Sequence, residues 1–272
     1  MSITKYQIFL KTAACGSFSK AAEAMNFTQS GISHAINSLE AELGVTLLSR
    51  NRGGVVLTAD GRALLPQVEK LCAAHHSMMQ TVESLKGMDS GLVKVATFSS
   101  VSFQWLPRIL KSFGQLYPNI EFEVVTGDFY DQIENWIVSG AVDCGFFRLP
   151  STKHLQTYSL YRDELQVVVP CDHPLAQADP FPVEELATEP FILLEEGEDY
   201  EIMAAFDKMG IRPQVKYTAR EDRTILAMVS EGLGISLLPR LMAKHSPLPV
   251  QICRAPMQFD RPIGIGVNDE KA

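Results

Sequence analysis

The sequence predicts two kinds of architecture along one chain, a helical part with one short β-hairpin followed by an alternating α/β part. Three observations lead to this prediction. Apolar residues over positions 16–44 and 59–86 recur at the spacings of three and four that are typical of amphipathic helices. A turn rich in asparagine and glycine separates two short apolar runs near position 52. From position 91 onward, apolar runs of strand length alternate with helical stretches, which indicates an α/β fold.

The segment 16–44 is predicted to form two short helices joined by a tight turn. One face of the second helix is apolar and should be buried, with members at spacings of four, three and four: Ile32, Ile36, Leu39 and Leu43. The opposite face carries neutral side chains that donate and accept hydrogen bonds: Gln29, Ser30, Ser33, His34 and Asn37. Such side chains suit the edges of base pairs in the major groove of DNA. A helical hairpin with a merely solvated polar face is the alternative, because helix-turn-helix patterns are degenerate.

A short β-hairpin is predicted directly after these helices. Its strands are Val45–Leu48 and Val55–Thr58, and they flank the turn Asn51-Arg52-Gly53-Gly54. Arg50 and Arg52 lie on or beside this turn. Arginines on such a wing can bind DNA phosphates, which positions the reading helix without recognising sequence.

Taken together, these residues resemble the LysR-type transcriptional regulators. The resemblance runs in order through Phe9, Gly16-Ser17-Phe18-Ser19, Ala21-Ala22, Thr28-Gln29-Ser30, Ser33, Leu39-Glu40, Leu43-Gly44, Leu47, Arg50, Leu57-Thr58 and Gly61. Ser30 departs from it where the family often has proline, and Leu48 where it usually has phenylalanine. The resemblance implies a winged helix-turn-helix that binds double-stranded promoter or operator DNA. The expected contacts are Thr28, Gln29, Ser30, Ser33, His34, Asn37, Arg50 and Arg52.

Residues 59–86 are predicted to form a long helix that pairs with a second copy of the chain. Its heptad seam alternates at four and three residues: Leu64, Val68, Leu71, His75, Met78, Val82 and Leu85. Thr58 can cap the start of this helix and Gly87 can end it. A two-fold dimer, or a dimer of dimers, would match paired DNA half-sites. The alternative is a long amphipathic helix packed on its own domain. His75 and His76 are not expected to bind metal, because adjacent histidines point to different helix faces.

The part after residue 90 is predicted to be α/β. Strands are expected at Leu92–Phe98, Ile120–Thr126, Val142–Phe147, Leu165–Val169, Phe191–Leu194, Gln214–Thr218, Ile235–Leu238 and Val250–Arg254. Helices are expected at Ser102–Tyr117, Tyr130–Ser139, Tyr200–Met209 and Arg220–Glu231. This alternation is typical of an α/β architecture with helices on both sheet faces.

The family resemblance extends into this part through Asp172-His173-Pro174-Leu175 and Gly232-Leu233-Gly234-Ile235-Ser236-Leu237-Leu238-Pro239. It implies a two-lobed α/β domain like that of periplasmic binding proteins, with a ligand held in the cleft between the lobes. Lobe I would be about 91–162 plus 262–272, with a last strand at Pro262–Val267, and lobe II about 163–260. The implied domains are 1–58 for DNA binding, 59–88 for dimerisation and 89–272 for effector binding. The family usually continues into another helix after Val267, so we expect a trimmed or naturally short member.

Candidate effector-binding residues lie where strands give way to helices. Ser99, Ser100 and Ser102 mark a helix N-terminus, where free backbone N–H groups and hydroxyls can receive an anion. Other candidates follow the carboxyl ends of strands, the edge where open α/β sheets bind ligands: Thr126, Phe147, Arg148 and Arg220. The serines and arginines favour an anionic effector, whereas Phe147 permits an aromatic one. Serines at a helix start are equally often only caps.

Charge and length agree with a DNA-binding part followed by a larger acidic part. A chain of 272 residues with net charge −8 is long for one domain, so two or three units are expected. Residues 1–58 hold five Lys or Arg against three Asp or Glu, whereas residues 91–272 hold sixteen against twenty-five. The basic surplus at the N-terminus is small, so two copies should be needed for useful DNA affinity.

Cysteine usage and hydropathy predict a cytoplasmic protein. The cysteines are scattered and odd in number, which argues against a disulfide framework: Cys15, Cys72, Cys144, Cys171 and Cys253. No apolar run is long enough to cross a bilayer, and the N-terminus lacks a signal-peptide pattern.

No catalytic constellation, metal site or cofactor is expected, because neither Cys144 nor Asp172-His173 has an evident partner in sequence. Two other functions stay open. One is a thiol-based redox sensor that uses Cys144 and Cys171. The other is a small-molecule binding protein without regulatory DNA binding.

Overall fold

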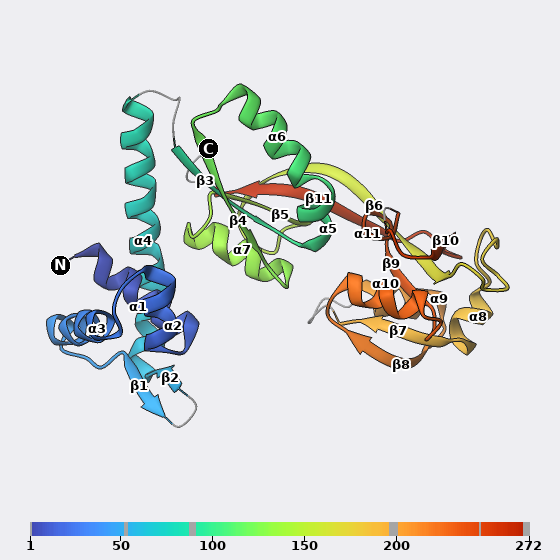
Figure 1. Cartoon of the computed structure of the whole chain (residues 1–272), viewed down its shortest axis with the longest axis horizontal. Coiled ribbons are helices and arrows are strands. Elements are labelled where there is room, and N and C mark those ends of the chain that lie inside the picture. The colour runs from blue at the N-terminus through green and yellow to red at the C-terminus, as the bar shows by residue number, and fades with distance from the viewer. Residues whose placement is uncertain (1, 52–53, 87–90, 196–200, 245, 269–272) are drawn as a thin grey trace. The chain divides into compact units, whose positions relative to one another are not determined.

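The computed structural model of the chain describes residues 2–51, 54–86, 91–195, 201–244 and 246–268 (Figure 1). The chain divides into two compact units. Unit 1 comprises residues 1–91 with 138–142, and unit 2 comprises residues 92–137 with 143–272. None of the helices in the described ranges combines the length and hydrophobicity that a bilayer-spanning segment needs.

Unit 1 is a three-helix core with a β-hairpin and a long helix. Its elements are α1 (Ile3–Cys15), α2 (Phe18–Met25), α3 (Gln29–Leu43), β1 (Leu48–Asn51), β2 (Gly54–Leu57) and α4 (Ala59–Lys86). Glycine at position 16 ends α1 in the left-handed conformation, with φ of 58°. The predicted apolar face of α3 is confirmed, because Ile32, Ile36 and Leu39 are buried against Phe9 of α1.

The first wing strand starts three residues later than the sequence predicted. β1 pairs antiparallel with β2, and Leu48 lies opposite Leu57. The backbone N–H groups of Leu47 and Leu48 donate to the Glu40 carboxylate at 2.7 and 3.1 Å. Leu47 is therefore tied to α3 through its N–H, while its carbonyl accepts from the N–H of Thr58 at 3.0 Å, directly after β2. The N–H of Val55 donates to the Gly16 carbonyl at 2.9 Å, which fastens the wing to the α1–α2 turn.

Helix α4 begins where the sequence predicted. The backbone N–H of Gly61 donates to the Thr58 hydroxyl at 2.9 Å, which confirms Thr58 as the cap. The Cβ of any other residue at position 61 would lie 2.1 Å from the Leu47 carbonyl oxygen, so this close approach requires glycine. The predicted end of the helix at Gly87 lies outside the described residues.

Unit 2 has the two-lobed α/β fold that the resemblance implied. Its strands are β3 (Gly91–Thr97), β4 (Ile120–Thr126), β5 (Cys144–Arg148), β6 (Gln156–Pro170), β7 (Pro190–Leu194), β8 (Gln214–Ala219), β9 (Ser236–Pro239), β10 (Val250–Arg254) and β11 (Asp260–Val267). Its helices are α5 (Ser99–Gln104), α6 (Leu106–Leu116), α7 (Tyr130–Ser139), α8 (Val183–Thr188), α9 (Glu201–Met209), α10 (Asp222–Ser230) and α11 (Arg240–Ala243).

Two long strands connect the lobes. The main sheet has the order β10-β6-β11-β5-β3-β4, with β9 also paired to β6. The first half of β6 pairs antiparallel with β11, and its second half pairs with β9 and β10. β7 and β8 form a separate parallel pair. The lobe II core is rich in phenylalanine and aliphatic residues, including Phe181, Phe191, Phe206, Ile225 and Leu237.

Two predicted elements of unit 2 differ from the structure by more than two residues at one end. The predicted strand 165–169 is the second half of β6, which begins at Gln156. Its first half is mostly exposed and held by backbone pairing, so it lacks the apolar run that marks a strand. The predicted helix 102–117 is two helices, α5 and α6, which meet at Trp105. Pro107, which has no N–H to donate, lies in the first turn of α6. The short helices α8 and α11 were not predicted.

Candidate DNA-binding surface and effector pocket

One side of α3 presents the neutral polar residues that the sequence singled out. We call Gln29, Ser30, Ser33, His34 and Asn37 the reading face. Ser33 is half-buried and the others are exposed. Thr28 lies at the start of the helix, where its hydroxyl accepts from the backbone N–H of Gly31 at 3.1 Å. Because Ile32 and Ile36 fill the core from the opposite side, the reading face is open to a partner.

Arg50 of the wing lies against the reading face. Its Nη2 donates to the Ser33 hydroxyl at 3.4 Å, and its guanidinium lies 4.5 Å from the centre of the Phe18 ring. This arrangement places a positive charge beside α3, where a DNA phosphate could be bound. Arg52, the other predicted wing contact, lies outside the described residues.

The predicted dimer seam of α4 has two parts in the structure. Leu64 and Val68 pack into the core of unit 1, so they contribute to its own stability. Further along, Leu71, Met78 and Val82 are exposed, Met78 by 54%. His75 is half-buried, and the side chain of Leu85 lies outside the described residues. The apolar surface available to a partner therefore begins at Leu71.

A pocket of about 800 Å³ opens in unit 2. It is lined by residues from the β3–α5, β4–α7 and β8–α10 junctions and from β11. Four predicted effector residues line it: Ser99, Ser102, Thr126 and Arg220. A pocket of this volume is in the range of small-molecule sites.

The other predicted effector residues do not line this pocket. Ser100 is fully buried, and its hydroxyl accepts a hydrogen bond from Arg261. Phe147 is fully buried in the lobe I core. Arg148 donates to the Glu201 carboxylate at 3.0 Å, which makes it part of an ion pair.

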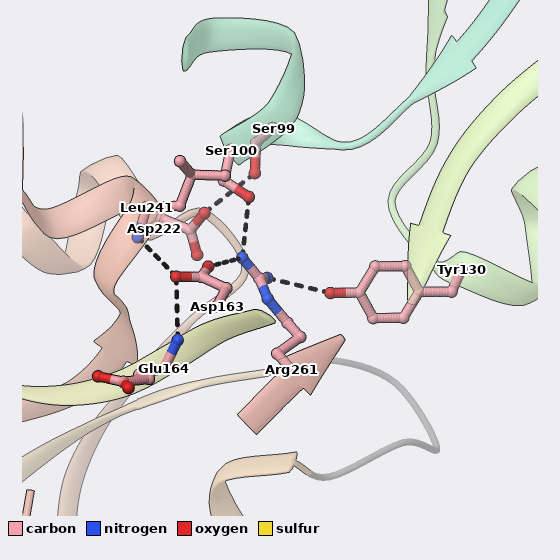
Figure 2. Close-up of polar contacts among 8 residues, drawn as sticks. All are labelled: Ser99, Ser100, Tyr130, Asp163, Glu164, Asp222, Leu241 and Arg261. Carbon is pink, nitrogen blue, oxygen red and sulfur yellow. Dashed lines mark hydrogen bonds and ion pairs between the residues drawn. The ribbon is translucent and has the colours of Figure 1, made fainter. Parts of the chain in front are cut away.

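One lining residue of the pocket, Arg261, belongs to a buried ion pair, and Figure 2 shows the contacts of this pair. Arg261 of β11 is 4% exposed and donates through Nη2 to Asp163 Oδ2 at 2.7 Å and to the Ser100 hydroxyl at 3.0 Å. Its Nη1 donates to the Tyr130 hydroxyl at 3.0 Å. Asp163 also accepts from the backbone N–H of Leu241 at 3.0 Å. Burial alone would lower the pKa of Arg261, but the Tyr130 hydroxyl and the Asp163 carboxylate beside the guanidinium outweigh it and raise the pKa.

Asp222, in the first turn of α10, forms part of the pocket wall. It is 7% exposed, and its Oδ2 accepts from the Ser99 hydroxyl at 3.0 Å (Figure 2). Burial raises the pKa of Asp222, although the nearby positive charge of Arg261 lowers it in part.

Sequence reasoning missed Asp163, Asp222 and Arg261. Arg261 and Asp163 are 98 positions apart, and Ser99 and Asp222 are 123 apart, so no local spacing reveals either contact. A usable signal existed only at Asp222, which lies in the charged run after β8 from which Arg220 alone was selected.

The thiols do not favour a redox sensor. Burial and the neighbouring Asp143 raise the pKa of Cys144 to about 11, so this thiol is protonated at neutral pH and is a poor nucleophile. Cys171 is exposed. In the described ranges no three His, Cys, Asp or Glu residues gather as a metal site would require.

Comparisons with known proteins match both units. A family model described as the bacterial regulatory helix-turn-helix protein, lysR family, matches residues 3–62, and the LysR substrate binding domain matches residues 86–271. The chain is 34% identical over 269 residues to the probable HTH-type transcriptional regulator LrrA of Synechococcus elongatus, covering 98% of this chain and 90% of that protein. It is 31% identical over 253 residues to the HTH-type transcriptional regulator YvbU of Bacillus subtilis, covering 93% and 86% respectively.

Solved structures share the fold. The crystal structure of CbnR, a LysR family transcriptional regulator, has a TM-score of 0.73 at 21% identity and covers 100% of this chain and 94% of that chain. CbnR in complex with its target DNA has a TM-score of 0.71 at 21% identity, with coverage of 99% and 94%. The family models match both units, and two relatives of at least 30% identity align over nearly the whole chain. This protein therefore belongs to the LysR family of transcriptional regulators.

Proposed function

We propose that the chain binds promoter or operator DNA through the reading face of α3 and responds to a small-molecule effector in the pocket of unit 2. The observation that carries this proposal is an exposed, neutral, hydrogen-bonding helix face with Arg50 beside it. Side chains of this kind can match donors and acceptors of base edges, while Arg50 binds a phosphate. Arg52 and Thr28 remain further proposed contacts.

Two copies of the chain provide two reading faces. The exposed residues Leu71, Met78 and Val82 of α4 supply an apolar seam for a homodimer, which can pair again into a tetramer. We assign 1–58 to DNA binding, 59–88 to dimerisation and 89–272 to effector binding.

The effector acts through unit 2. Ser99, Ser102, Thr126 and Arg220 come from different strand ends around the pocket, so a bound molecule can favour one arrangement of the lobes over another. This changed arrangement would alter how the paired reading faces engage DNA. The chain acts by binding rather than by catalysis, and it works in the cytoplasm, where bacterial DNA is found.

A binding experiment with the chain's own upstream DNA tests the proposal. The full chain should bind this DNA more tightly than unrelated DNA of the same length, as measured by fluorescence anisotropy. His34→Ala should reduce the difference in binding free energy between the two DNAs by about 1 to 3 kcal/mol. His154→Ala in unit 2 should not change this difference. Equal binding of both DNAs by the unmodified chain would refute the proposal.

A further inference from the structure

The charges around the pocket do not balance. Its lining includes three arginines, of which two are paired: Arg261 with Asp163 at 2.7 Å and Arg220 with Glu195 at 3.1 Å. Arg223 is the remaining cation among the described lining residues. Against it stand four carboxylates that make no ion pair in the described ranges: Asp128, Asp131, Glu221 and Asp222. This surplus of carboxylates over cations favours positively charged ligands.

Arg223 does not neutralise any of these four carboxylates. Its guanidinium lies 3.8 Å from the centre of the Phe103 ring, and it makes no ion pair with a described carboxylate. The ring therefore already accepts one cation. The guanidinium of Arg261 likewise lies over the Phe98 ring, 5.2 Å from its centre. Aromatic rings of this pocket are thus suited to positive groups.

Asp222 is the carboxylate best placed to receive such a group. One of its oxygens accepts from Ser99, and no described residue donates to the other. The side chain is 7% exposed, and burial raises its pKa, so its negative charge lacks a full complement within the chain. A buried charge that is only partly compensated is unfavourable, and a cation bound beside it would complete the compensation.

Phe129 supplies a free aromatic face for the same ligand. It lines the pocket and is 38% exposed. In the described ranges no other ring and no cation stacks on it, unlike Phe98 and Phe103.

The hydroxyls expected to receive an anion are already engaged. Ser99 donates its proton to Asp222, and Ser102 donates to the backbone carbonyl of Ser99 at 3.0 Å. A carboxylate placed at Ser99 would lie beside the Asp222 carboxylate and be repelled by it.

From these contacts we propose that the pocket binds a small organic ammonium compound with an apolar body. The ammonium group lies against the free oxygen of Asp222, and the body packs on Phe129. This inference deepens the effector role proposed above, because it names the chemical class of the ligand.

Matched probes of opposite charge test the ligand class on the full chain. We choose 2-phenylethylamine, its carboxylate counterpart 3-phenylpropionate and the neutral 2-phenylethanol, each titrated by calorimetry near neutral pH at low salt. The amine should bind at least about tenfold more tightly than the carboxylate, with the alcohol between them. Tighter binding of the carboxylate would overturn the proposal. So would the failure of 2-phenylethylamine, agmatine and putrescine to bind at up to about 10 mM, which exceeds the Kd of weak ligands.

Substitutions of Asp222 and Phe129 test whether these side chains contact the ligand. Asp222→Asn keeps the size of the side chain and removes its charge, so it should weaken binding of 2-phenylethylamine about tenfold or more. Glu184→Gln, which removes an exposed carboxylate outside the pocket, should not change it. Phe129→Leu should weaken binding about threefold, whereas Phe27→Leu in unit 1 should leave it intact. Unchanged binding in Asp222→Asn would overturn the proposed contact, and if that variant fails to fold, the Phe129→Leu comparison decides.

DNA binding separates this proposal from the effector role on which it rests. If 2-phenylethylamine binds and Asp222→Asn weakens it, yet affinity for the upstream DNA never changes, the ligand class stands and the effector role fails. If 3-phenylpropionate binds more tightly and changes DNA affinity, the effector role stands and the ammonium class is wrong.

Discussion

The reading face of α3 and the pocket of unit 2 are built in opposite ways. The reading face lies on one helix, and its residues span Gln29 to Asn37. The pocket joins groups that are far apart in sequence, such as Ser99 and Asp222, which are 123 positions apart. The first surface is neutral and exposed, whereas the second contains buried charge. Local spacing therefore encodes the reading face, while the pocket depends on how the strands of unit 2 assemble.

The largest expected effect comes from breaking the buried ion pair beside the pocket. Arg261→Met leaves Asp163 charged and buried, so it should lower the free energy of unfolding of unit 2 by about 3 to 5 kcal/mol. Arg254→Met is the matched control, because its pair with Asp179 is exposed and should contribute about 0 to 1 kcal/mol. Urea unfolding of both variants measures the difference. Equal losses in the two would show that the pocket does not depend on buried charge.

The two faces of α3 should respond differently to truncation. Ile36→Ala leaves a cavity in the core of unit 1 and should lower the free energy of unfolding by about 2 to 5 kcal/mol. Asn37→Ala, its exposed neighbour, should stay within about 0.5 kcal/mol of the unmodified chain. Thermal unfolding, monitored by circular dichroism, measures the difference in stability between the two variants. A large loss in Asn37→Ala would mean that the reading face is part of the fold rather than free for DNA.

Arg50 should contribute affinity without sequence preference. Arg50→Ala removes the proposed phosphate contact, so affinity should fall alike for upstream and unrelated DNA. The slope of log affinity against log salt should shrink by about 1. Anisotropy titrations over a salt series measure both effects. If Arg50→Ala instead changed the preferred sequence, Arg50 would be reading bases.

The smallest expected effect is a pH dependence from Asp222. Burial raises its pKa in the folded chain above the ordinary value of 3.8, so the folded chain binds this proton more tightly than the unfolded chain does. The stabilisation from this group is full below pH 3.8 and is lost as pH rises through the raised pKa. Asp222→Asn removes this dependence, so its stability relative to the unmodified chain should improve from acid to neutral pH. Urea unfolding at several pH values checks this, and a constant difference would contradict it.

The parts predicted best from the sequence are those with local signals. The bounds of β4, α7 and β10 were predicted to the residue, because each is a short periodic run between turn residues. β1 was misplaced, because the Glu40 carboxylate binds the N–H groups of Leu47 and Leu48 from another element. In the pocket, the rule that ligands bind at strand ends found Ser99 and Thr126. It could not find Arg261, whose partner Ser100 is 161 positions away.

The proposed function depends most on contact between the exposed side of α3 and base edges. The most direct measurement is the affinity of the unmodified chain and of Gln29→Ala for operator DNA in which every base pair is exchanged in turn. Gln29→Ala should lose discrimination between base pairs, by about 1 to 3 kcal/mol, at one or two adjacent positions and keep it elsewhere. Gln115→Ala on α6 should leave the whole profile unchanged. An identical profile for Gln29→Ala and the unmodified chain would contradict the claim.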